Sequence, residues 1–368
     1  MSERATPSQR EEGREAARYN RFKAAVGAHG CAPSPAHRPP LGITLVADEP
    51  LARHTTFRIG GPADLYAAVS RIEQLEALAE LALAHEVPIT ILGGGSNVLV
   101  SDAGVRGLVI ANQTRNWVSN IGYSALDKSQ VSGPNTQHPI SNICLTADSG
   151  VPLAGLARAA IREGLAGLEW AVSVPGTVGG AVVGNAGAHG GQIADILAWA
   201  LVTYPGQGRR LLSAAELKFG YRSSILKAPP YPPPRGGPVG RPATAGGAGE
   251  AIVLAAGFEL KAGDVAELTA RADGFLARRR ASQPTEPSAG SVFRNPPGDY
   301  AGRLIEAVGL KGYSIGGAQI SPRHANFIVN TGSATAADVF SLMELIKARV
   351  YERFGIELVP EISLIGEW

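Results

Sequence analysis

The sequence predicts a mixed α/β region followed by a separate α+β unit. Helical repeats alternate with short apolar runs, two dense glycine clusters interrupt that alternation, and the last third has its own set of elements. The 368 residues suffice for about two or three domains with a sizeable core. With 45% hydrophobic and 18% charged residues, the composition is that of an ordinary globular protein.

Charge and cysteine content exclude several classes of function. The formal net charge of +2 is too small to indicate a nucleic-acid or membrane partner. The two cysteines, Cys31 and Cys144, have no metal-binding spacing, so we expect neither a metal site nor a disulfide framework. Residues 1–21 lack the apolar core of a signal peptide, and no apolar run is long enough to cross a membrane. We therefore expect a cytoplasmic protein.

The first 40 residues are expected to form a loosely ordered tail. They alternate charged residues with Ala, Pro and Ser, and only residues 11–28 favour a short helix. The compact chain is expected to begin near Leu41.

The next elements alternate between helix and strand. Apolar residues at helical spacing predict a helix over 71–85, introduced by a capping box that joins Ser70 and Glu73. Short apolar runs at Ile89–Leu92 and 107–111 predict strands. A further helix is expected to begin at Pro152 and end at Gly164.

Two segments have compositions that do not build a core. Residues 117–141 are polar and without a period, which indicates an inserted loop. Residues 228–250 are nearly all Pro, Gly and Ala and are predicted to be a mobile insertion.

The last third predicts an α+β unit. A strand over 251–260 and a helix over 263–280 lead into it. Thr335 and Asp338 are expected to start another helix, whose apolar stripe, Met343 included, faces a core. Residues 356–365 are predicted to form a final strand that carries Glu361.

The first glycine cluster, 93–97, follows a predicted strand. Glycines there allow backbone amides to approach a pyrophosphate, and Ser96 and Asn97 add side-chain donors. A plain tight turn is the alternative.

The second cluster, 173–188, is a stretch of small residues with almost no side chains. Such a backbone surface suits a flat ring and a diphosphate. Neither cluster fits the dinucleotide motif G-x-G-x-x-G or the P-loop, so both of those sites are disfavoured.

Three segments in this order carry a family resemblance: 56–63 (Thr-Phe-Arg-Ile-Gly-Gly-Pro-Ala), 93–97 and 173–180. Together they resemble the FAD-binding domain of the vanillyl-alcohol-oxidase (PCMH) type. Within that superfamily the chain resembles the UDP-N-acetylenolpyruvoylglucosamine reductase family, from about Leu41 to Ile365. The extra tyrosine-bearing loop of the family's longer subgroup is not visible, so the shorter subgroup is expected.

The resemblance implies a domain organisation. The two parts of the FAD-binding domain would span 41–112 and 113–262, the second with insertions near 117–141 and 228–250. A substrate-binding α+β domain would follow over 263–357. The C-terminal strand, 358–368, would return to the active site.

The resemblance also implies the ligands. One bound FAD is expected, with NADPH as co-substrate and a UDP-sugar nucleotide as substrate; a monomer is the default. The residues expected to contact FAD are Arg58, Gly93, Gly94, Gly95, Ser96, Asn97, Ser173, Pro175, Gly176, Thr177, Gly180 and Asn185.

The implied activity is that of a UDP-N-acetylmuramate dehydrogenase in peptidoglycan precursor synthesis. In this family the vinyl carbon of UDP-N-acetylglucosamine enolpyruvate receives a hydride from flavin N5, and negative charge builds on the neighbouring carbon and carboxylate. The protein must stabilise that enolate and supply one proton.

The same resemblance assigns three catalytic residues. Arg222 would clamp the carboxylate and enolate, for which a forked, permanently charged guanidinium is suited. Ser291 would donate the proton, which a hydroxyl can do beside a strongly basic carbanion in a dry pocket. Glu361 would pair with Arg222 and support the enolate, as either the carboxylate or the protonated acid. From the residues alone, a surface arginine, a turn serine and a solvent-facing glutamate remain the alternatives.

Four further residues are expected to bind substrate. Tyr221 and Asn295 adjoin catalytic residues, and His324 lies in a stretch that borders the substrate in the shorter subgroup. Arg280, in the run Arg278 to Arg280, would face the substrate diphosphate. A satisfied core histidine and a solvated helix end are the alternatives for His324 and Arg280.

Two other functions compete with the reductase. Another FAD enzyme of the superfamily, such as an oxidase of alcohols or sugars, would have no reason to keep Arg222, Ser291 and Glu361 together. A non-catalytic flavin-binding or scaffold protein would bind flavin that NADPH does not reduce.

Overall fold

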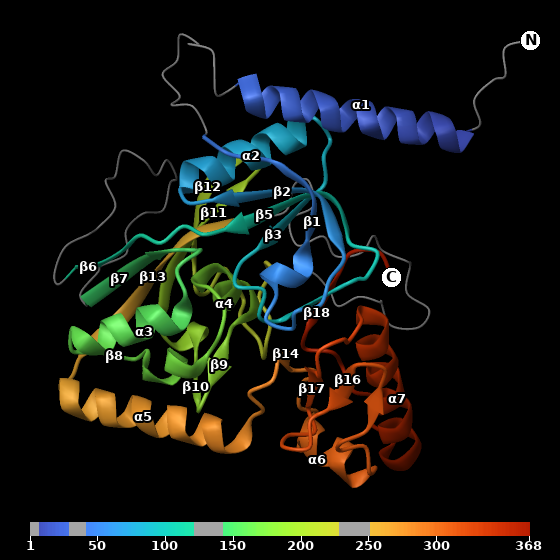
Figure 1. The fold of residues 1–368 in the computed structure, drawn as a ribbon. Coiled ribbons are helices and arrows are strands. Elements are labelled where there is room, and N and C mark those ends of the chain that lie inside the picture. Colours follow the sequence, from blue (N-terminus) through green and yellow to red (C-terminus); the bar gives the residue numbers. More distant parts are fainter. Residues whose placement is uncertain (1–6, 29–41, 121–142, 228–250) are drawn as a thin grey trace, which may run out of the picture.

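Three sheets carry most of the chain in a computed structural model that describes residues 7–28, 42–120, 143–227 and 251–368 (Figure 1). The predicted insertion at 228–250 and most of the one at 117–141 lie outside the described residues.

The first sheet has the strand order β1-β2-β5-β3. β1 is antiparallel to β2, whereas β2 and β3 both run parallel to β5. The strands are β1 (Val46–Pro50), β2 (Pro62–Val69), β3 (Ile89–Leu92) and β5 (Val105–Asn112), with the 3₁₀ turn η1 (Leu51–His54) between β1 and β2. Helix α2 (Ile72–Ala84) packs its apolar face on this sheet and confirms the helix predicted there.

Helix α1 (Pro7–Ala28) packs against α2 and is longer than the short helix expected within the tail. Phe22 is fully buried and Val26 nearly so, in the same cluster as α2. Apolar burial of this kind stabilises a helix whose polar composition contributes little. This part of the expected loose tail is therefore ordered against the compact chain, whose first strand begins at Val46.

The second sheet is antiparallel, with the order β12-β11-β13-β7-β6. Its strands are β6 (Trp117–Asn120), β7 (Ile143–Asp148), β11 (Leu197–Tyr204), β12 (Gly208–Ser213) and β13 (Ile252–Ala262); the short β8 (Leu165–Ala166) pairs with the end of β13. Residues 117–141 were predicted as a loop, but the first four residues of that segment form the strand β6. The strand predicted over 251–260 is confirmed as β13.

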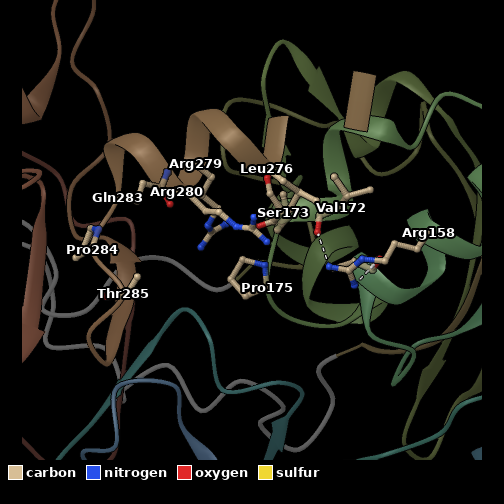
Figure 2. Close-up of a pocket in the computed structure, with 12 residues that line it drawn as sticks. Arg158, Val172, Ser173, Pro175, Leu276, Arg279, Arg280, Gln283, Pro284 and Thr285 are labelled. Atoms are coloured by element: carbon tan, nitrogen blue, oxygen red, sulfur yellow. Dashed lines mark hydrogen bonds between the residues drawn. The ribbon is translucent and has the colours of Figure 1, made fainter. Parts of the chain in front are cut away.

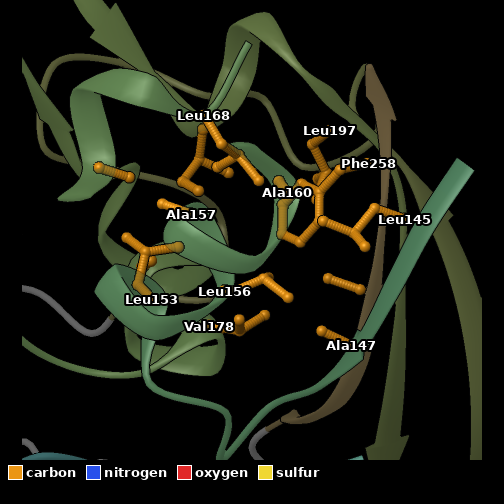
Figure 3. Close-up of a cluster of buried hydrophobic side chains, with 14 of the residues drawn as sticks. Leu145, Ala147, Leu153, Leu156, Ala157, Ala160, Leu168, Val178, Leu197 and Phe258 are labelled. Carbon is orange, nitrogen blue, oxygen red and sulfur yellow. The ribbon is translucent and has the colours of Figure 1, made fainter. Parts of the chain in front are cut away.

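One face of this sheet is covered by helices that build the core shown in Figure 3. They are α3 (Leu153–Arg162), η3 (Glu169–Ser173), α4 (Val178–Gly184) and α5 (Val265–Ser282), with η4 (Ile193–Asp195) nearby. Leu156 of α3 and Val178 of α4 pack toward Leu145 and Phe258 of the sheet. α3 and α5 match the predicted helices to within a few residues, and Pro152 precedes α3 as its N-cap.

The C-terminal unit is a four-stranded sheet, β14-β17-β16-β15, backed by α6 and α7 (Figure 1). Its elements are β14 (Ser288–Ser291), α6 (Ala301–Ala307), β15 (Ser314–Ile315), β16 (Ala318–Ile320), β17 (Phe327–Asn330) and α7 (Ala336–Phe354). The hydroxyl of Thr335 accepts from the Asp338 N–H, and the Asp338 carboxylate accepts from the Thr335 N–H. This confirms the predicted helix start.

Two details differ from the sequence prediction. The amide oxygen of Gln74, not Glu73, accepts from the N–H groups of Ser70 and Arg71 before α2. The final strand, β18 (Ser363–Ile365), is shorter than predicted, so Glu361 lies in the irregular approach to it. β18 pairs in parallel with β4 (Val98–Val100), and this pairing involves only three residues of each strand.

Candidate active site

A cavity of about 650 Å³ lies where both large sheets and the C-terminal unit meet. Its volume is in the range of cofactor and substrate pockets. Its walls come from the β3–β4 connection, the segment from η3 to the hairpin of β9 (Gly187–Ala188) and β10 (Gly191–Gln192), the end of β14 and the approach to β18. Segments far apart in the sequence therefore share one site.

The two glycine clusters pack directly against each other in the cavity wall. A Cβ added to Gly93 would clash with the Thr177 hydroxyl, and one on Gly94 would lie 3.0 Å from the Cα of Gly176. Gly95 has φ +57°, which L side chains rarely adopt, and its Cβ would clash with the His54 carbonyl. Glycine is required here for close backbone approach, beyond the needs of a plain turn.

Other glycines leave room for a ligand. Gly184 and Gly290 line the cavity, and a Cβ on either would meet no protein atom within 4 Å. The cavity thus has long stretches of bare backbone beside the hydroxyl groups of Ser96 and Thr177 and the amide of Asn97. Such walls fit the FAD that the family resemblance implies, because a flat ring and a diphosphate can lie against main chain.

Arg222 and Glu361 form an ion pair in the cavity wall. The Arg222 Nε lies 2.8 Å from the Glu361 Oε1, and its Nη2 donates to the carbonyl of Gly187 at 2.7 Å. Nε makes no well-aligned hydrogen bond, so its contact with Glu361 is an ionic one. The guanidinium also lies over the Tyr221 ring, 5.4 Å from the centroid. The structure therefore brings together a cation and a carboxylate that are remote in sequence.

Arg222 is presented by a tight turn. The N–H of Gly220 donates to the Ser223 carbonyl at 3.0 Å, and Arg222 itself has φ +54°. The Asn185 amide donates to the Gly220 carbonyl at 2.9 Å, and the Ser224 hydroxyl to Val183 at 2.7 Å. These bonds hold the turn on α4.

Two cations that sequence reasoning missed lie in the same wall. Lys227 donates to the carbonyl of Arg222 at 3.1 Å. Arg294 follows β14, and its buried Nε has no hydrogen-bond partner. Both interact electrostatically with Glu361. The signal in the sequence was their position: each lies only a few residues from a predicted catalytic residue.

Burial raises the pKa of Glu361, and attraction from Arg222, Lys227 and Arg294 partly offsets that rise. Burial likewise lowers the pKa of Lys227 to about 8, aided by the positive charges of Arg294 and Arg222. The wall thus has three cationic side chains around one carboxylate. An anionic group entering the cavity would meet a net positive field.

Ser291 ends β14 and lines the same cavity as the glycine segments. Its backbone pairs with Phe327 of β17, and the next residue, Val292, donates to Asn326 at 2.9 Å. The Asn326 side chain in turn bonds both the N–H and the carbonyl of Phe293. These buried bonds fix the strand end that carries the serine.

Most of the predicted residues meet in this cavity. The predicted catalytic residues Arg222, Ser291 and Glu361 are joined there by ten predicted cofactor contacts: Gly93, Gly94, Gly95, Ser96, Asn97, Ser173, Pro175, Gly176, Thr177 and Gly180.

Several other predicted contacts do not line it. Asn185, at φ +44°, is buried and anchors the Arg222 turn and the N–H of Ala194. The Asn295 side chain accepts from Ala301 at the start of α6. His324 accepts from the Asn326 N–H at 3.2 Å, and burial lowers its pKa, which fits the satisfied core histidine. Arg58 and Tyr221 are largely exposed.

Arg280 lines a neighbouring pocket of about 330 Å³, which shares Ser173 and Arg279 with the main cavity (Figure 2). Arg158 enters from α3 and donates to Val172 at 3.3 Å, while Arg279 donates to the Ser173 carbonyl. Figure 2 shows Pro175 between Arg158 of α3 and Arg279 of α5. The predicted role of Arg280 at a diphosphate stays a prediction.

The described residues hold no group of three or more His, Cys, Asp or Glu that could bind a metal ion. Across these ranges no helix is both long and apolar enough to span a bilayer.

Comparisons with known proteins agree with this geometry. Residues 283–365 match the C-terminal domain of UDP-N-acetylenolpyruvoylglucosamine reductase, and residues 63–211 match an FAD binding domain. The reductase of Chloroflexus aggregans is 42% identical over 325 residues, covering 88% of this chain and 99% of that protein. The reductase of Synechococcus is also 42% identical, over 89% of this chain and 96% of its own.

A solved structure gives the same picture. The crystal structure of UDP-N-acetylenolpyruvylglucosamine reductase from Thermus caldophilus aligns with a TM-score of 0.64 and 33% identity. The alignment covers 88% of this chain and 98% of that one. The predicted fold class, an FAD-binding domain followed by a C-terminal α+β domain, is confirmed.

Proposed function

Because the chain belongs to the UDP-N-acetylenolpyruvoylglucosamine reductase family, we propose that it reduces UDP-N-acetylglucosamine enolpyruvate to UDP-N-acetylmuramate, with bound FAD and with NADPH as reductant. The observation that carries this proposal is the shared cavity. The Arg222–Glu361 ion pair, Ser291 and both glycine segments line it together.

The proposed chemistry divides between cofactor and protein. When bound along the glycine segments, FAD would supply hydride chemistry for the vinyl carbon of the substrate. Arg222 binds the substrate carboxylate and stabilises the negative charge that develops there, since its guanidinium already points along the wall toward Glu361 and Gly187. The Ser291 hydroxyl donates the proton to the neighbouring carbon.

Glu361 holds Arg222 in place. The backbone carbonyl of Glu361 accepts from the Asn97 side-chain amide at 3.2 Å. The backbone N–H of Glu361 donates to the Val292 carbonyl at 2.7 Å. Its backbone thus links the first glycine cluster to the segment after Ser291. NADPH and the sugar nucleotide would take turns in this cavity. We further propose a cytoplasmic monomer.

The proposal is tested by anaerobic flavin spectroscopy. The purified protein should carry yellow flavin whose absorbance fades on addition of NADPH. UDP-N-acetylglucosamine enolpyruvate should then restore it, with one lactyl-ether product formed per flavin. If this substrate does not restore the flavin colour, the substrate assignment is wrong; if no flavin binds even after reconstitution, the enzyme assignment is wrong.

The same sample separates the reductase from an oxidase with covalently tethered flavin. His189 lines the cavity but stacks on Phe275 at 4.5 Å and contacts the Ser173 hydroxyl at 3.3 Å. We therefore expect acid precipitation to release all flavin into the supernatant. Flavin retained in the pellet would favour the oxidase.

A further inference from the structure

Lys227 occupies a place in the site that the proposed chemistry does not use. It lines the cavity, and its Nζ donates to the backbone carbonyl of Arg222 at 3.1 Å. Lys227 lies in the same segment as Arg222, and a second turn of the chain brings its side chain back to the Arg222 carbonyl. In that turn the Lys227 N–H donates to the Ser224 carbonyl at 3.2 Å. Removing a charged amine from water beside other cations costs free energy, which other interactions must compensate.

The hydrogen bond from Lys227 to the Arg222 backbone carbonyl is one such interaction. Arg222 sits at φ +54°, in the third position of the turn from Gly220 to Ser223, where glycine or asparagine is the usual residue. A side chain in this region is strained and persists only when its surroundings hold it. The Lys227 ammonium holds the carbonyl at the strained residue itself, whereas Asn185 and Ser224 hold its neighbours.

The charge of Lys227 also acts on the carboxylate of the site. The charged groups around it are Arg222 from its own segment, Arg294 from the end of β14 and Glu361 from the approach to β18. Lys227 attracts Glu361 and repels both arginines. The ammonium therefore favours the ionised carboxylate that pairs with Arg222.

We infer that Lys227 is a positioning residue: it fixes the turn that aims the Arg222 guanidinium into the cavity and supports the ionised partner of that guanidinium. This inference rests on the proposed function, for which Arg222 binds the substrate carboxylate. Lys227 itself needs no contact with substrate.

Charge is the property that the role requires, which gives it a pH dependence. Burial and the neighbouring cations lower the pKa of Lys227 to about 8. As pH rises through that value, the amine loses its proton, and both the attraction to Glu361 and the charge-assisted bond to Arg222 are lost. Activity should therefore fall on the alkaline side near pH 8. An arginine at this position would stay charged and remove that fall.

The experiment compares Lys227→Met, Lys227→Arg and the control Lys218→Met. Lys218 is exposed and lies earlier in the same segment, so its variant controls for loss of a lysine. Misplacing a catalytic group by about 1 Å can cost about 100-fold in rate. We expect Lys227→Met to lower kcat about 10- to 100-fold with KM changed far less. Lys227→Arg should recover part of kcat and flatten the alkaline limb, and Lys218→Met should match the parent.

Circular dichroism and thermal unfolding verify that each variant is folded. A folded Lys227→Met variant with parental kcat and an unchanged alkaline limb overturns the inference. If that variant does not fold, Lys227→Arg decides: an alkaline limb identical to the parent's overturns the inference, and a flattened limb supports it.

A second measurement needs no turnover. Competitive acetylation followed by mass spectrometry reports the pKa of each lysine in the flavin-loaded protein. Lys227 should titrate near pH 8, and Glu361→Gln should lower the pKa of Lys227 further. An unchanged titration of Lys227 in the Glu361→Gln protein would overturn the electrostatic half of the inference. If the parent protein fails to reduce the proposed substrate, the function fails, yet this titration still decides whether Lys227 and Glu361 are coupled.

Discussion

Ser291 is the residue on which the proposed proton transfer depends. It stands at the end of β14, in the cavity wall that also contains Arg222 and Glu361. Replacing it with alanine removes the donor and leaves the strand pairing intact, because that pairing uses backbone atoms. We expect flavin reduction by NADPH to proceed at the parental rate. The substrate-dependent second half should slow by about 100- to 10,000-fold, the usual contribution of general acid catalysis.

Rapid-mixing spectroscopy separates the two halves of this reaction. The control is Ser333→Ala, at an exposed serine just before α7, which should leave both halves unchanged. Equal slowing of both halves by Ser291→Ala would indicate a structural effect and contradict the proton-donor role.

At the residue scale, the sequence revealed groups that match a family motif and missed groups whose role depends on burial. Arg222, Ser291 and Glu361 each lie in a recognisable segment. Lys227 and Arg294 become part of the site only when the fold removes them from water beside Glu361. The FAD contact of Asn185 stays a prediction, and its αL backbone and its bond to the Arg222 turn became visible only in the structure.

At the element scale, helix α4 and its preceding loop form the bare wall of the cavity. Gly184 is the last residue of α4, lines the cavity and has open space where a side chain would lie. Gly184→Leu should fill the space proposed for FAD. Overpacking of a fitted site costs about 1–3 kcal/mol, so flavin affinity should fall about 10- to 100-fold. The measurement is flavin fluorescence during titration of the deflavinated protein.

The control for this variant is Gly274→Leu in the middle of α5. A Cβ there also meets no atom within 4 Å, but Gly274 lies outside the cavity. This variant should bind flavin like the parent and gain about 0.8–1 kcal/mol of stability, because leucine favours a helix far more than glycine does. Parental flavin affinity in the folded Gly184→Leu protein would show that FAD lies elsewhere.

Elements with a strong period were predictable, and those that depend on a distant partner were not. α2, α3, α5 and α7 follow from apolar residues at helical spacing and from their end signals. β6 was missed because its four residues, Trp-Val-Ser-Asn, do not alternate between apolar and polar, and its pairing with β7 defines it. β18 was overestimated, since it pairs only with the three-residue β4 and nothing in its own sequence marks that limit.

At the scale of the whole molecule, segments from the first third of the chain enter the C-terminal unit. Phe57 is fully buried in the C-terminal core, and its carbonyl accepts from the Asn330 amide at 3.1 Å. The Asp102 carboxylate accepts from the N–H groups of Ala336 and Ala337 at the start of α7, at 2.8 and 2.9 Å. Arg222 follows β12 of the antiparallel sheet, whereas Glu361 lies in the approach to β18. We therefore expect these contacts, called the join below, to set the geometry of the Arg222–Glu361 ion pair.

Phe57→Ala should therefore weaken both stability and catalysis. Truncating a fully buried phenylalanine costs about 3–5 kcal/mol of unfolding free energy. Phe258→Ala is the matched control, since Phe258 is also fully buried but lies in the core under the antiparallel sheet. Denaturant unfolding should show similar losses of stability in the two variants.

At temperatures where both variants are folded, Phe57→Ala should lower kcat about 10-fold or more, because a shift of the join separates Arg222 from Glu361. Phe258→Ala should keep kcat near the parental value. Equal kcat in the two folded variants would mean that the join does not position the catalytic pair.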